Sequence, residues 1–281
     1  MRSAAVLPNG KLRRNQRHPN PVPPHRPNPN LTLWLIGGTR ESAELATRCE
    51  PNDAWVITVT TARAKNLYPD THASVLVTRF TAENIGAFMR EYRIRKILDV
   101  SHPHAVHISR LAIACSKQYQ IPYLRYERPP VVSDCENCFY WPDLTALFTH
   151  YPLQQERILV TIGYRQLPVL KRFWGQQTWF VRIVPDPMAL TTALETGFMP
   201  QHIMALWPPV SRDLERAIWR NWGITQVIAK ASGAPGGEDI KHQLAQELGV
   251  TLHLLQRPRI DYPRWTADLQ VALAFARDAR P

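Results

Sequence analysis

A short apolar run followed by two glycines begins the patterned part of the chain, and it reads Leu33-Trp34-Leu35-Ile36-Gly37-Gly38-Thr39-Arg40-Glu41. The run predicts a buried strand, because strands covered on both faces carry few polar side chains. Residues 41–48 have helical character, so we expect a strand, a tight turn and a helix in succession. Glycines let a ligand approach the backbone closely, and the N-terminus of a helix offers free N–H groups to an anion.

Strands and helices alternate along the rest of the chain, which predicts parallel sheets built from right-handed crossover units. Further strands are expected at 55–60, 74–78, 96–100 and 122–125 and, after a proline-containing linker at 127–143, at 157–162, 179–184, 203–206, 226–230 and 251–255. Helices are expected at 81–92, 105–119, 211–222, 238–248 and 265–277. The expected fold class is α/β, with two doubly wound, Rossmann-like domains at 31–130 and 131–281 and a cleft between them.

The formal charge of +11 in 281 residues is concentrated near the N-terminus. Residues 1–30 contain seven prolines, six basic side chains and no acid, a composition that predicts a disordered tail. The other 28 basic and 23 acidic residues leave a net charge of +5, which suits an enzyme with an anionic ligand and does not require nucleic acid. No run of about 18 apolar residues predicts a membrane span, and no signal peptide is evident. We therefore expect a cytoplasmic protein.

The four cysteines are too few for a disulfide framework in a chain of this length. Cys135 and Cys138 form one C-x-x-C motif. A structural zinc site needs four ligands, which usually come from two such pairs or from nearby histidines, and the second pair is absent. We therefore expect ordinary reduced thiols and no metal site.

The turn at Gly37, Gly38 and Thr39 predicts binding of a dinucleotide, although it is shorter than the full G-x-G-x-x-G fingerprint. The alternative is a plain strand–helix turn that needs glycine for packing. Thr61 and Arg63 follow the second strand, near the position that meets the adenosine ribose in dinucleotide folds. A basic side chain there favours a 2′-phosphate, so the pattern favours NADPH, with NADH as the alternative.

Two later motifs also follow predicted strands. The first is Ser101-His102-Pro103-His104, at the carboxyl end of a strand, where we expect side chains that face the cleft. The second is Lys230-Ala231-Ser232-Gly233-Ala234-Pro235-Gly236-Gly237, which leads into the helix that carries Lys241. Its lysine, hydroxyl and loop amides can form a second anion site. The alternatives are structural histidines in the first motif and a flexible surface loop in the second.

Taken in order, these motifs resemble the precorrin-6A reductase family of cobalamin biosynthesis. The resemblance covers about residues 31–260 and includes Arg125-Tyr126-Glu127-Arg128-Pro129 and Gln256-Arg257-Pro258. It implies NAD(P)H-dependent reduction of one carbon–carbon double bond of precorrin-6A, or of its cobalt form, to the 6B form. It also implies a tetrapyrrole substrate with several carboxylates, which lysine and arginine side chains bind well.

On this resemblance, the candidate site residues fall into three groups. The expected cofactor-binding residues are Gly37, Gly38, Thr39, Arg40, Glu41, Thr61 and Arg63. The expected substrate-binding residues are Arg128, Lys230, Ser232, Gly236, Gly237 and Lys241, in the second domain and the segment that leads to it. The expected catalytic residues, beside the nicotinamide and the substrate, are His102 and Ser101.

Two positions depart from the family pattern. Ser101 stands where the family commonly has threonine, and it keeps the hydroxyl group. Ala231 stands where the family commonly has an acid, so a proton would have to come from water or from a substrate carboxyl group. Two other functions stay open at this point: a different NAD(P)-dependent oxidoreductase with a small substrate, and a non-enzymatic protein that binds a nucleotide or nucleic acid. The sequence does not fix the oligomeric state.

Overall fold

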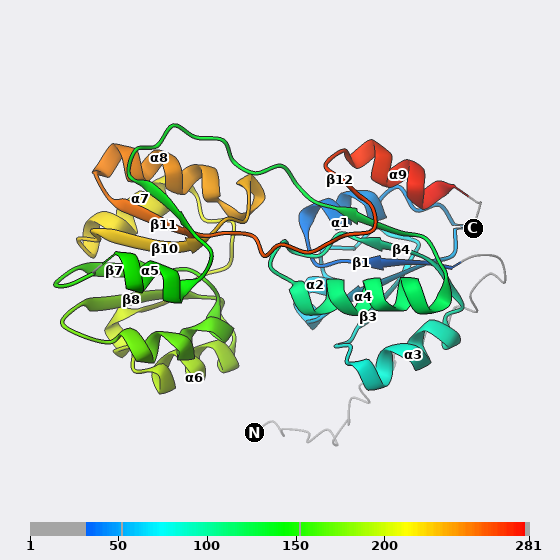
Figure 1. The fold of residues 1–281 in the computed structure, drawn as a ribbon, viewed down its shortest axis with the longest axis horizontal. Helices are drawn as coiled ribbons and strands as arrows, with labels where there is room; N and C mark the ends of the chain where they lie inside the picture. The colour runs from blue at the N-terminus through cyan, green and yellow to red at the C-terminus, as the bar shows by residue number, and fades with distance from the viewer. Residues whose placement is uncertain (1–31, 52, 152, 279–281) are drawn as a thin grey trace, which may run out of the picture.

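The computed structural model of the protein describes residues 32–51, 53–151 and 153–278, which form two α/β domains (Figure 1). Each domain contains one six-stranded sheet, and every strand pairing in both sheets is parallel. The predicted class of two doubly wound parallel sheets is therefore confirmed. The predicted tail at 1–30 lies outside the described residues.

The first sheet has the strand order β12-β5-β4-β1-β2-β3. Its strands are β1 (Thr32–Ile36), β2 (Trp55–Val59), β3 (Ser74–Val77), β4 (Ile94–Asp99), β5 (Tyr123–Tyr126) and β12 (Trp265–Thr266). Its helices are α1 (Arg40–Ala46), α2 (Ala62–Lys65), α3 (Ala82–Glu91), α4 (Val106–Tyr119) and α9 (Leu269–Arg277). Side chains alternate along β1, so Leu33 and Leu35 pack under α1 and α9, while Trp34 and Ile36 pack under α3 and α4.

The second sheet has the strand order β6-β11-β10-β7-β8-β9. Its strands are β6 (Cys138–Trp141), β7 (Arg157–Val160), β8 (Thr178–Ile183), β9 (Ile203–Ala205), β10 (Gln226–Lys230) and β11 (Thr251–Leu255). Its α-helices are α5 (Leu144–His150), α6 (Pro187–Thr196), α7 (Arg212–Asn221) and α8 (Glu238–Leu248). Three 3₁₀ segments lie at Tyr164–Phe173, Pro200–His202 and Ala234–Gly236. One face of the sheet packs on α5 and α6, and the other packs on α7 and α8.

Two segments pass between the domains, and they change the sequence-based division of the chain (Figure 1). The first crossing segment, residues 127–137, leads from β5 to β6, which pairs with β11 in the second sheet. The second crossing segment, residues 256–264, leads from β11 to β12, which pairs with β5 in the first sheet. The last elements of the chain, assigned to the second domain by the sequence, therefore belong to the first.

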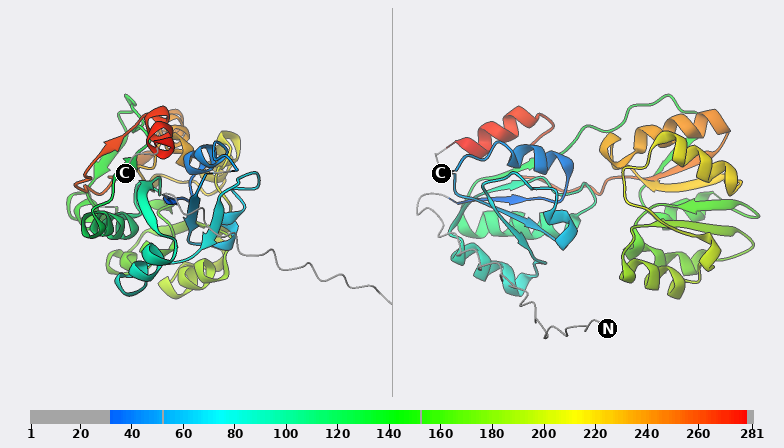
Figure 2. Two further views of the ribbon diagram at one scale, coloured as in Figure 1. Left: turned by 90° about the vertical axis from the view of Figure 1, so that its right-hand side faces the viewer. Right: turned by 180° about the vertical axis from the view of Figure 1, so that it is seen from behind.

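The apolar side of α9 explains this return. Ala272, Leu273 and Ala276 are buried in the same core cluster as Leu45 of α1, so α9 covers a face of the first sheet that would otherwise stay exposed. Both views in Figure 2 keep α9 beside α1 on this face. The helix expected at 265–277 begins at Leu269, because Asp268 caps its N-terminus through the Gln270 N–H group. The linker expected at 127–143 contains β6 in its second half.

The C-x-x-C motif also differs from its prediction. Cys135 and Cys138 are joined by a disulfide bond, so the expectation of ordinary reduced thiols is wrong for this pair. The local turn, in which Cys138 N donates a hydrogen bond to Cys135 O at 3.2 Å, brings the two side chains together. Cys49 and Cys115 are free and buried.

Each sheet reverses its strand order at one point. In the first sheet the reversal lies between β1 and β4, and in the second it lies between β7 and β10. Ligands of doubly wound sheets bind beyond the carboxyl ends of the strands at such points. The glycine turn follows β1, the histidine motif follows β4 and the Lys230 loop follows β10. Among the described residues, no helix is both long and apolar enough to span a bilayer.

Candidate functional site

The two glycines between β1 and α1 have different reasons to be glycine. A Cβ atom on Gly37 would lie 2.3 Å from the Tyr68 hydroxyl oxygen, so this position is glycine for packing. Gly38 has φ +96°, its N–H group donates to Tyr68 Oη at 2.7 Å, and a Cβ atom there would meet nothing within 4 Å. Gly37 thus matches the packing alternative, whereas Gly38 leaves open space beside the backbone.

The side chains that follow this turn serve the protein itself. Thr39 caps α1, and its hydroxyl donates to Val100 O at 2.8 Å, so it is engaged inside the fold. Arg40 is exposed. Glu41 is buried and pairs with Arg128, with 3.0 Å between Oε1 and Nε. Of the residues expected to bind an anion in this turn, Gly38 and Arg40 are exposed, and the N–H group of Gly38 is engaged by Tyr68.

The residues after β2 lie at the same edge of the first sheet as the glycine turn after β1. Thr61 caps α2 by accepting a hydrogen bond from Ala64 N at 3.1 Å. The exposed Arg63 stacks on the indole ring of Trp207 in the second domain, with its guanidinium carbon 3.5 Å from the ring centroid. This cation–π contact bridges the two domains at the edge where the sequence predicts the adenosine ribose.

A buried charged network supports the end of β4, and sequence reasoning missed it. The Asp99 carboxylate accepts hydrogen bonds from Ser101 N, Ser109 Oγ, Tyr123 Oη and Arg125 Nη1 at 2.6–3.0 Å. Burial alone would raise the pKa of Asp99, but Arg125 and the hydroxyl donors hold it below its ordinary value. The same guanidinium donates to Ser101 Oγ at 3.0 Å. Ser101 is thereby fixed and almost fully buried.

His102 is held as a neutral imidazole. Its Nδ1 accepts a hydrogen bond from His104 N at 3.2 Å, which leaves the ring proton on Nε2. Burial, followed by the charges of Arg128 and the neighbouring groups, lowers the pKa of His102 to about 3. Burial and the charge of Lys230 likewise lower the pKa of His104 to about 4. A neutral ring cannot act as a strong acid at pH 7, but its Nε2–H group can donate a hydrogen bond.

Lys230, at the end of β10, is the counterpart of these histidines on the second domain. Among the described residues it has no carboxylate partner. Burial and then the charge of Arg165 lower the pKa of Lys230 to about 8. The influence of Lys230 on both His102 and His104 indicates that the strand-end edges of the two domains approach each other here.

The loop after Lys230 is built around close backbone approaches. A Cβ atom on Gly236 would lie 2.0 Å from Ser232 Oγ, so the loop closes over this hydroxyl only with glycine there. Lys241 is buried, and its Nζ donates to Gly237 O at 3.0 Å. Burial, followed by the charge of Arg182, lowers the pKa of Lys241 to about 8. In this arrangement Lys241 supports the loop from beneath.

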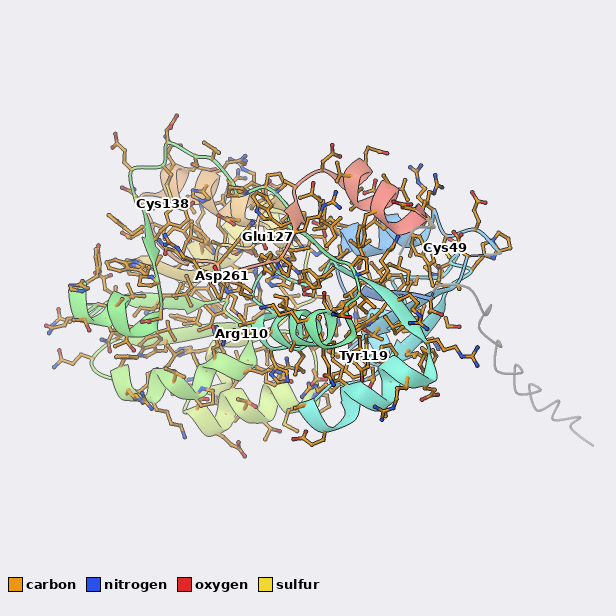
Figure 3. The ribbon with its side chains drawn as sticks, turned by 45° about the vertical axis from the view of Figure 1, so that its right-hand side comes forward. Cys49, Arg110, Tyr119, Glu127, Cys138 and Asp261 are labelled. Atoms are coloured by element: carbon orange, nitrogen blue, oxygen red, sulfur yellow. A yellow bond between two sulfur atoms is a disulfide. The ribbon has the colours of Figure 1, made fainter. Side chains whose placement is uncertain are left out.

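Arg257 joins the two crossing segments to this loop. Its guanidinium donates to Arg128 O at 2.6 Å, to Pro129 O at 3.2 Å and to Ala231 O at 3.1 Å, and it pairs with Glu127 at 3.3 Å. Figure 3 labels Glu127 on the first crossing segment and Asp261 on the second. The expected cleft between the domains is bridged by Arg257 and by the contact of Arg63 with Trp207.

The structure brings His102, Arg128 and Lys230 into one electrostatic environment, as the sequence motifs predict. The polar groups of Thr39 and Lys241 are instead engaged inside their own domains, by Val100 O and Gly237 O. Sequence reasoning missed Gly163, which has φ +87° and follows β7 at the second switch point, near Lys230. The signal was available, because Ile162-Gly163 after a buried strand repeats the pattern of Ile36-Gly37.

Comparisons with known proteins agree with this architecture. A family model described as Precorrin-6x reductase CbiJ/CobK matches residues 32–277. A cobalt-precorrin-6A reductase from Synechocystis sp. is 38% identical over 256 residues, which cover 89% of this chain and 97% of the relative. A precorrin-6A reductase from Rhodobacter capsulatus is 26% identical over 88% of this chain and 96% of its own. A solved structure of CobK precorrin-6A reductase has a TM-score of 0.73 at 22% identity, covering 89% of this chain and 97% of that one.

Proposed function

This chain belongs to the precorrin-6x reductase family CbiJ/CobK, and from that premise we propose that it reduces cobalt-precorrin-6A to the 6B form with NADPH. Membership makes it an oxidoreductase of cobalamin biosynthesis that reduces a precorrin-6A ring with a nicotinamide cofactor. The choice of the cobalt-containing ring is supported by the names of relatives from Synechocystis sp., Priestia megaterium and Salmonella typhimurium.

The observation that supports the proposed substrate site is that the ammonium group of Lys230 has no carboxylate partner among the described residues. A partly buried ammonium group with no carboxylate partner among the described residues is suited to a carboxylate that arrives with a ligand. Arg128 and Arg257, in contrast, already pair with Glu41 and Glu127. We therefore assign a substrate carboxylate to Lys230 first and to the Ser232 hydroxyl second. The N–H groups of Gly236 and Gly237, also expected at the substrate, already donate to Gly233 O and Ala234 O, so these glycines would shape the loop around the substrate.

The turn after β1 is the proposed place for the cofactor. The open space beside Gly38 and its positive φ fit a pyrophosphate group, and Arg40 is exposed next to it. Thr61 and Arg63 would lie near the adenosine, where the Arg63 guanidinium would leave Trp207 to pair with a 2′-phosphate. When bound, a reduced nicotinamide supplies the hydride.

His102 is the residue proposed to contact the reacting part of the ring, and Ser101 is the residue proposed to position it. The Nε2–H group of neutral His102 would donate a hydrogen bond to the substrate without adding a charge. Ser101, held by Arg125 and Asp99, would fix the backbone that positions His102. Ala231 carries no acidic group, so the proton that completes the reduction would come from water or from a substrate carboxyl group.

An anaerobic assay with two ring substrates and two cofactors tests this function. The full chain is incubated with precorrin-6A or its cobalt form, and with NADPH or NADH, and both cofactor oxidation and product mass are followed. We expect turnover to be fastest with the cobalt ring and NADPH, and the product to be heavier by two hydrogen atoms. Absence of turnover in all four combinations would contradict the proposal, and a preference for the metal-free ring would contradict its choice of substrate.

Replacing Arg63 separates NADPH from NADH. The Arg63→Ala variant would lose a charge-assisted contact with the 2′-phosphate, which is worth about 1.5–3 kcal/mol, or roughly a tenfold to hundredfold rise in Kd for NADPH. Affinity for NADH should not change. Arg95→Ala is the matched control, because Arg95 is exposed near the start of β4, at the opposite end of the same sheet. Equal losses for the two cofactors would rule out a 2′-phosphate contact.

A further inference from the structure

A second cluster with metal-ligand chemistry lies in the second domain, outside the site described above. Cys135 lies in the first crossing segment, and Cys138 begins β6, far from Cys49 in the other domain (Figure 3). Helix α8 brings His242 to this pair, so that one ring nitrogen and both sulfur atoms lie within 4.8 Å of one another. Cys135 and His242 are buried, and Cys138 is partly exposed.

The fold explains why these three residues meet. Cys138 and Tyr140 are two residues apart on β6 and therefore share one face of the strand. Helix α8 packs on that face, since Tyr140 Oη lies 3.3 Å from His242 Nε2. No sequence spacing would have revealed this, because His242 is more than 100 positions further along the chain.

The two nitrogens of His242 have unequal surroundings. Nε2 faces Tyr140 Oη and, at 3.7 Å, the buried carboxylate oxygen Oε1 of Glu238. Nδ1 is buried and has no hydrogen-bond partner. A buried polar nitrogen without a partner is costly, whereas a carboxylate behind the second ring nitrogen is the usual support of a metal-bound histidine. The side chain is thus oriented for a ligand at Nδ1.

We propose that the reduced form of this cluster binds Zn²⁺ or a similarly soft divalent ion through Cys135 Sγ, Cys138 Sγ and His242 Nδ1, and that the disulfide is the metal-free form of the same site. Thiolate and imidazole are the ligands that such ions prefer. Zn–S and Zn–N bonds of about 2.3 and 2.0 Å would place the ligand atoms roughly 3.3–3.8 Å from one another. The two sulfur atoms, which are bonded to each other in the disulfide, would therefore move apart after reduction, whereas the ring nitrogen already lies within 4.8 Å of both. Solvent reaches the partly exposed Cys138 and would complete four-coordination.

The disulfide is reduced before the metal binds. A dithiol reductant gives two electrons and two protons to the disulfide and itself becomes a disulfide, which leaves two cysteine thiols. Binding of Zn²⁺ to the two thiols and His242 then releases both thiol protons. The second oxygen of Glu238 accepts a hydrogen bond from Gly233 N at 2.5 Å, so the carboxylate behind His242 also holds the loop that follows Lys230. The proposed metal site does not depend on the proposed reductase function.

Titration with Co²⁺, a spectroscopic substitute for Zn²⁺, tests the site directly. The full chain is reduced anaerobically, freed of reductant and titrated. We expect one Co²⁺ per chain, with thiolate-to-cobalt charge transfer and the intense visible bands of a tetrahedral site, and displacement by Zn²⁺. The oxidised chain should give neither signal. Cys138→Ser should lose the charge-transfer intensity of one thiolate, and His242→Ala should weaken binding at least about tenfold.

Two control variants and one measurement on the unaltered chain make the test decisive. Cys115→Ser, a buried free cysteine, and His150→Ala, an exposed histidine of the same domain, should bind Co²⁺ like the unaltered chain. If His242→Ala does not fold, alkylation of the reduced unaltered chain replaces it: Zn²⁺ should protect Cys135 and Cys138 but not change the reactivity of Cys115. Equal alkylation with and without Zn²⁺, or full Co²⁺ binding by His242→Ala, would overturn the proposal.

Discussion

Lys230 is a basic residue of the site whose ammonium group has no carboxylate partner among the described residues. Arg125 and Arg128 each contact a carboxylate, and Lys241 donates to a backbone carbonyl. A partly buried lysine without such a partner loses solvation and gains little in return, which is why the pKa of Lys230 falls to about 8. A ligand carboxylate would stabilise the charged form of such a lysine. The free energy that its burial costs in the free protein would then favour binding of the substrate.

The pH dependence of the reaction follows from this residue. Lys230 loses its positive charge as the pH rises through about 8, so kcat/KM for a polyanionic substrate should be constant below that pH and fall above it. Lys230→Arg, whose side chain stays charged, should move the fall to higher pH. Lys230→Met should lower kcat/KM about 10- to 100-fold and flatten this limb.

The pH profile of the Lys230→Arg variant also shows whether Lys230 or Lys241 causes the fall in kcat/KM. Lys241 has a similarly lowered pKa of about 8, but it lies beneath the loop. A Lys230→Arg profile that still falls near pH 8 would assign the limb to Lys241 or to another group, and it would contradict the role given to Lys230.

At this scale, the sequence predicts residues better than it predicts their partners. His102 and Lys230 could be found because each lies at the carboxyl end of a buried strand. The ion pairs of Asp99 with Arg125 and of Glu41 with Arg128 could not be predicted. Both depend on which strands and loops lie side by side in the fold, and the local sequence does not show this. Glu41, expected at the cofactor, instead neutralises the charge of Arg128.

At the scale of elements, the turn between β1 and α1 combines packing and openness. Gly37 is closed in by Tyr68, while Gly38 faces open space.

The alternation of strands and helices could be predicted because the apolar runs and caps are local. The short edge strands β6 and β12 could not be, since β6 lies among prolines and β12 has only two residues. Both become strands because they pair with β11 and β5.

Replacing Gly38 with alanine tests whether the openness of this turn serves the cofactor. Gly249, at the end of α8, is a matched control: it also has a positive φ, of +64°, and a Cβ atom there also meets nothing within 4 Å. Each variant should lose about 1–2 kcal/mol of unfolding free energy from the left-handed backbone alone. Only Gly38→Ala should raise the Kd for NADPH, by at least about tenfold, as measured by calorimetry. Equal cofactor affinity in both variants would mean that Gly38 serves the turn and not the cofactor.

At the scale of the whole molecule, the chain crosses between the domains twice, and each crossing adds an edge strand to the sheet that it reaches. The predicted boundary near residue 130 falls within the first crossing segment, and the predicted division does not include the return of β12 to the first sheet. The return could not be inferred locally, because α9 is an ordinary amphipathic helix that either domain could have buried. Arg257 fixes both crossings at one point, beside the loop that carries Ser232.

Removal of Arg257 should therefore loosen the connection between the domains. Arg257→Ala deletes hydrogen bonds to three backbone carbonyls and an ion pair with Glu127, each worth about 1–3 kcal/mol. We expect faster amide hydrogen exchange in residues 127–137 and 256–264, with the two sheets unaffected. Arg259→Ala, at an exposed position of the same segment, should leave exchange unchanged. The same exchange rates in both variants would refute this role.

The transfer of deuterium from the cofactor to the ring tests the proposed function most directly. NADPH carrying deuterium at both C4 positions is supplied anaerobically with cobalt-precorrin-6A and the full chain, and the product is analysed by mass spectrometry. Hydride transfer between the strand-end edges of the two domains predicts a 6B product that contains one deuterium from the cofactor. A reduced product without deuterium, or an unreduced ring beside unoxidised NADPH, would contradict it.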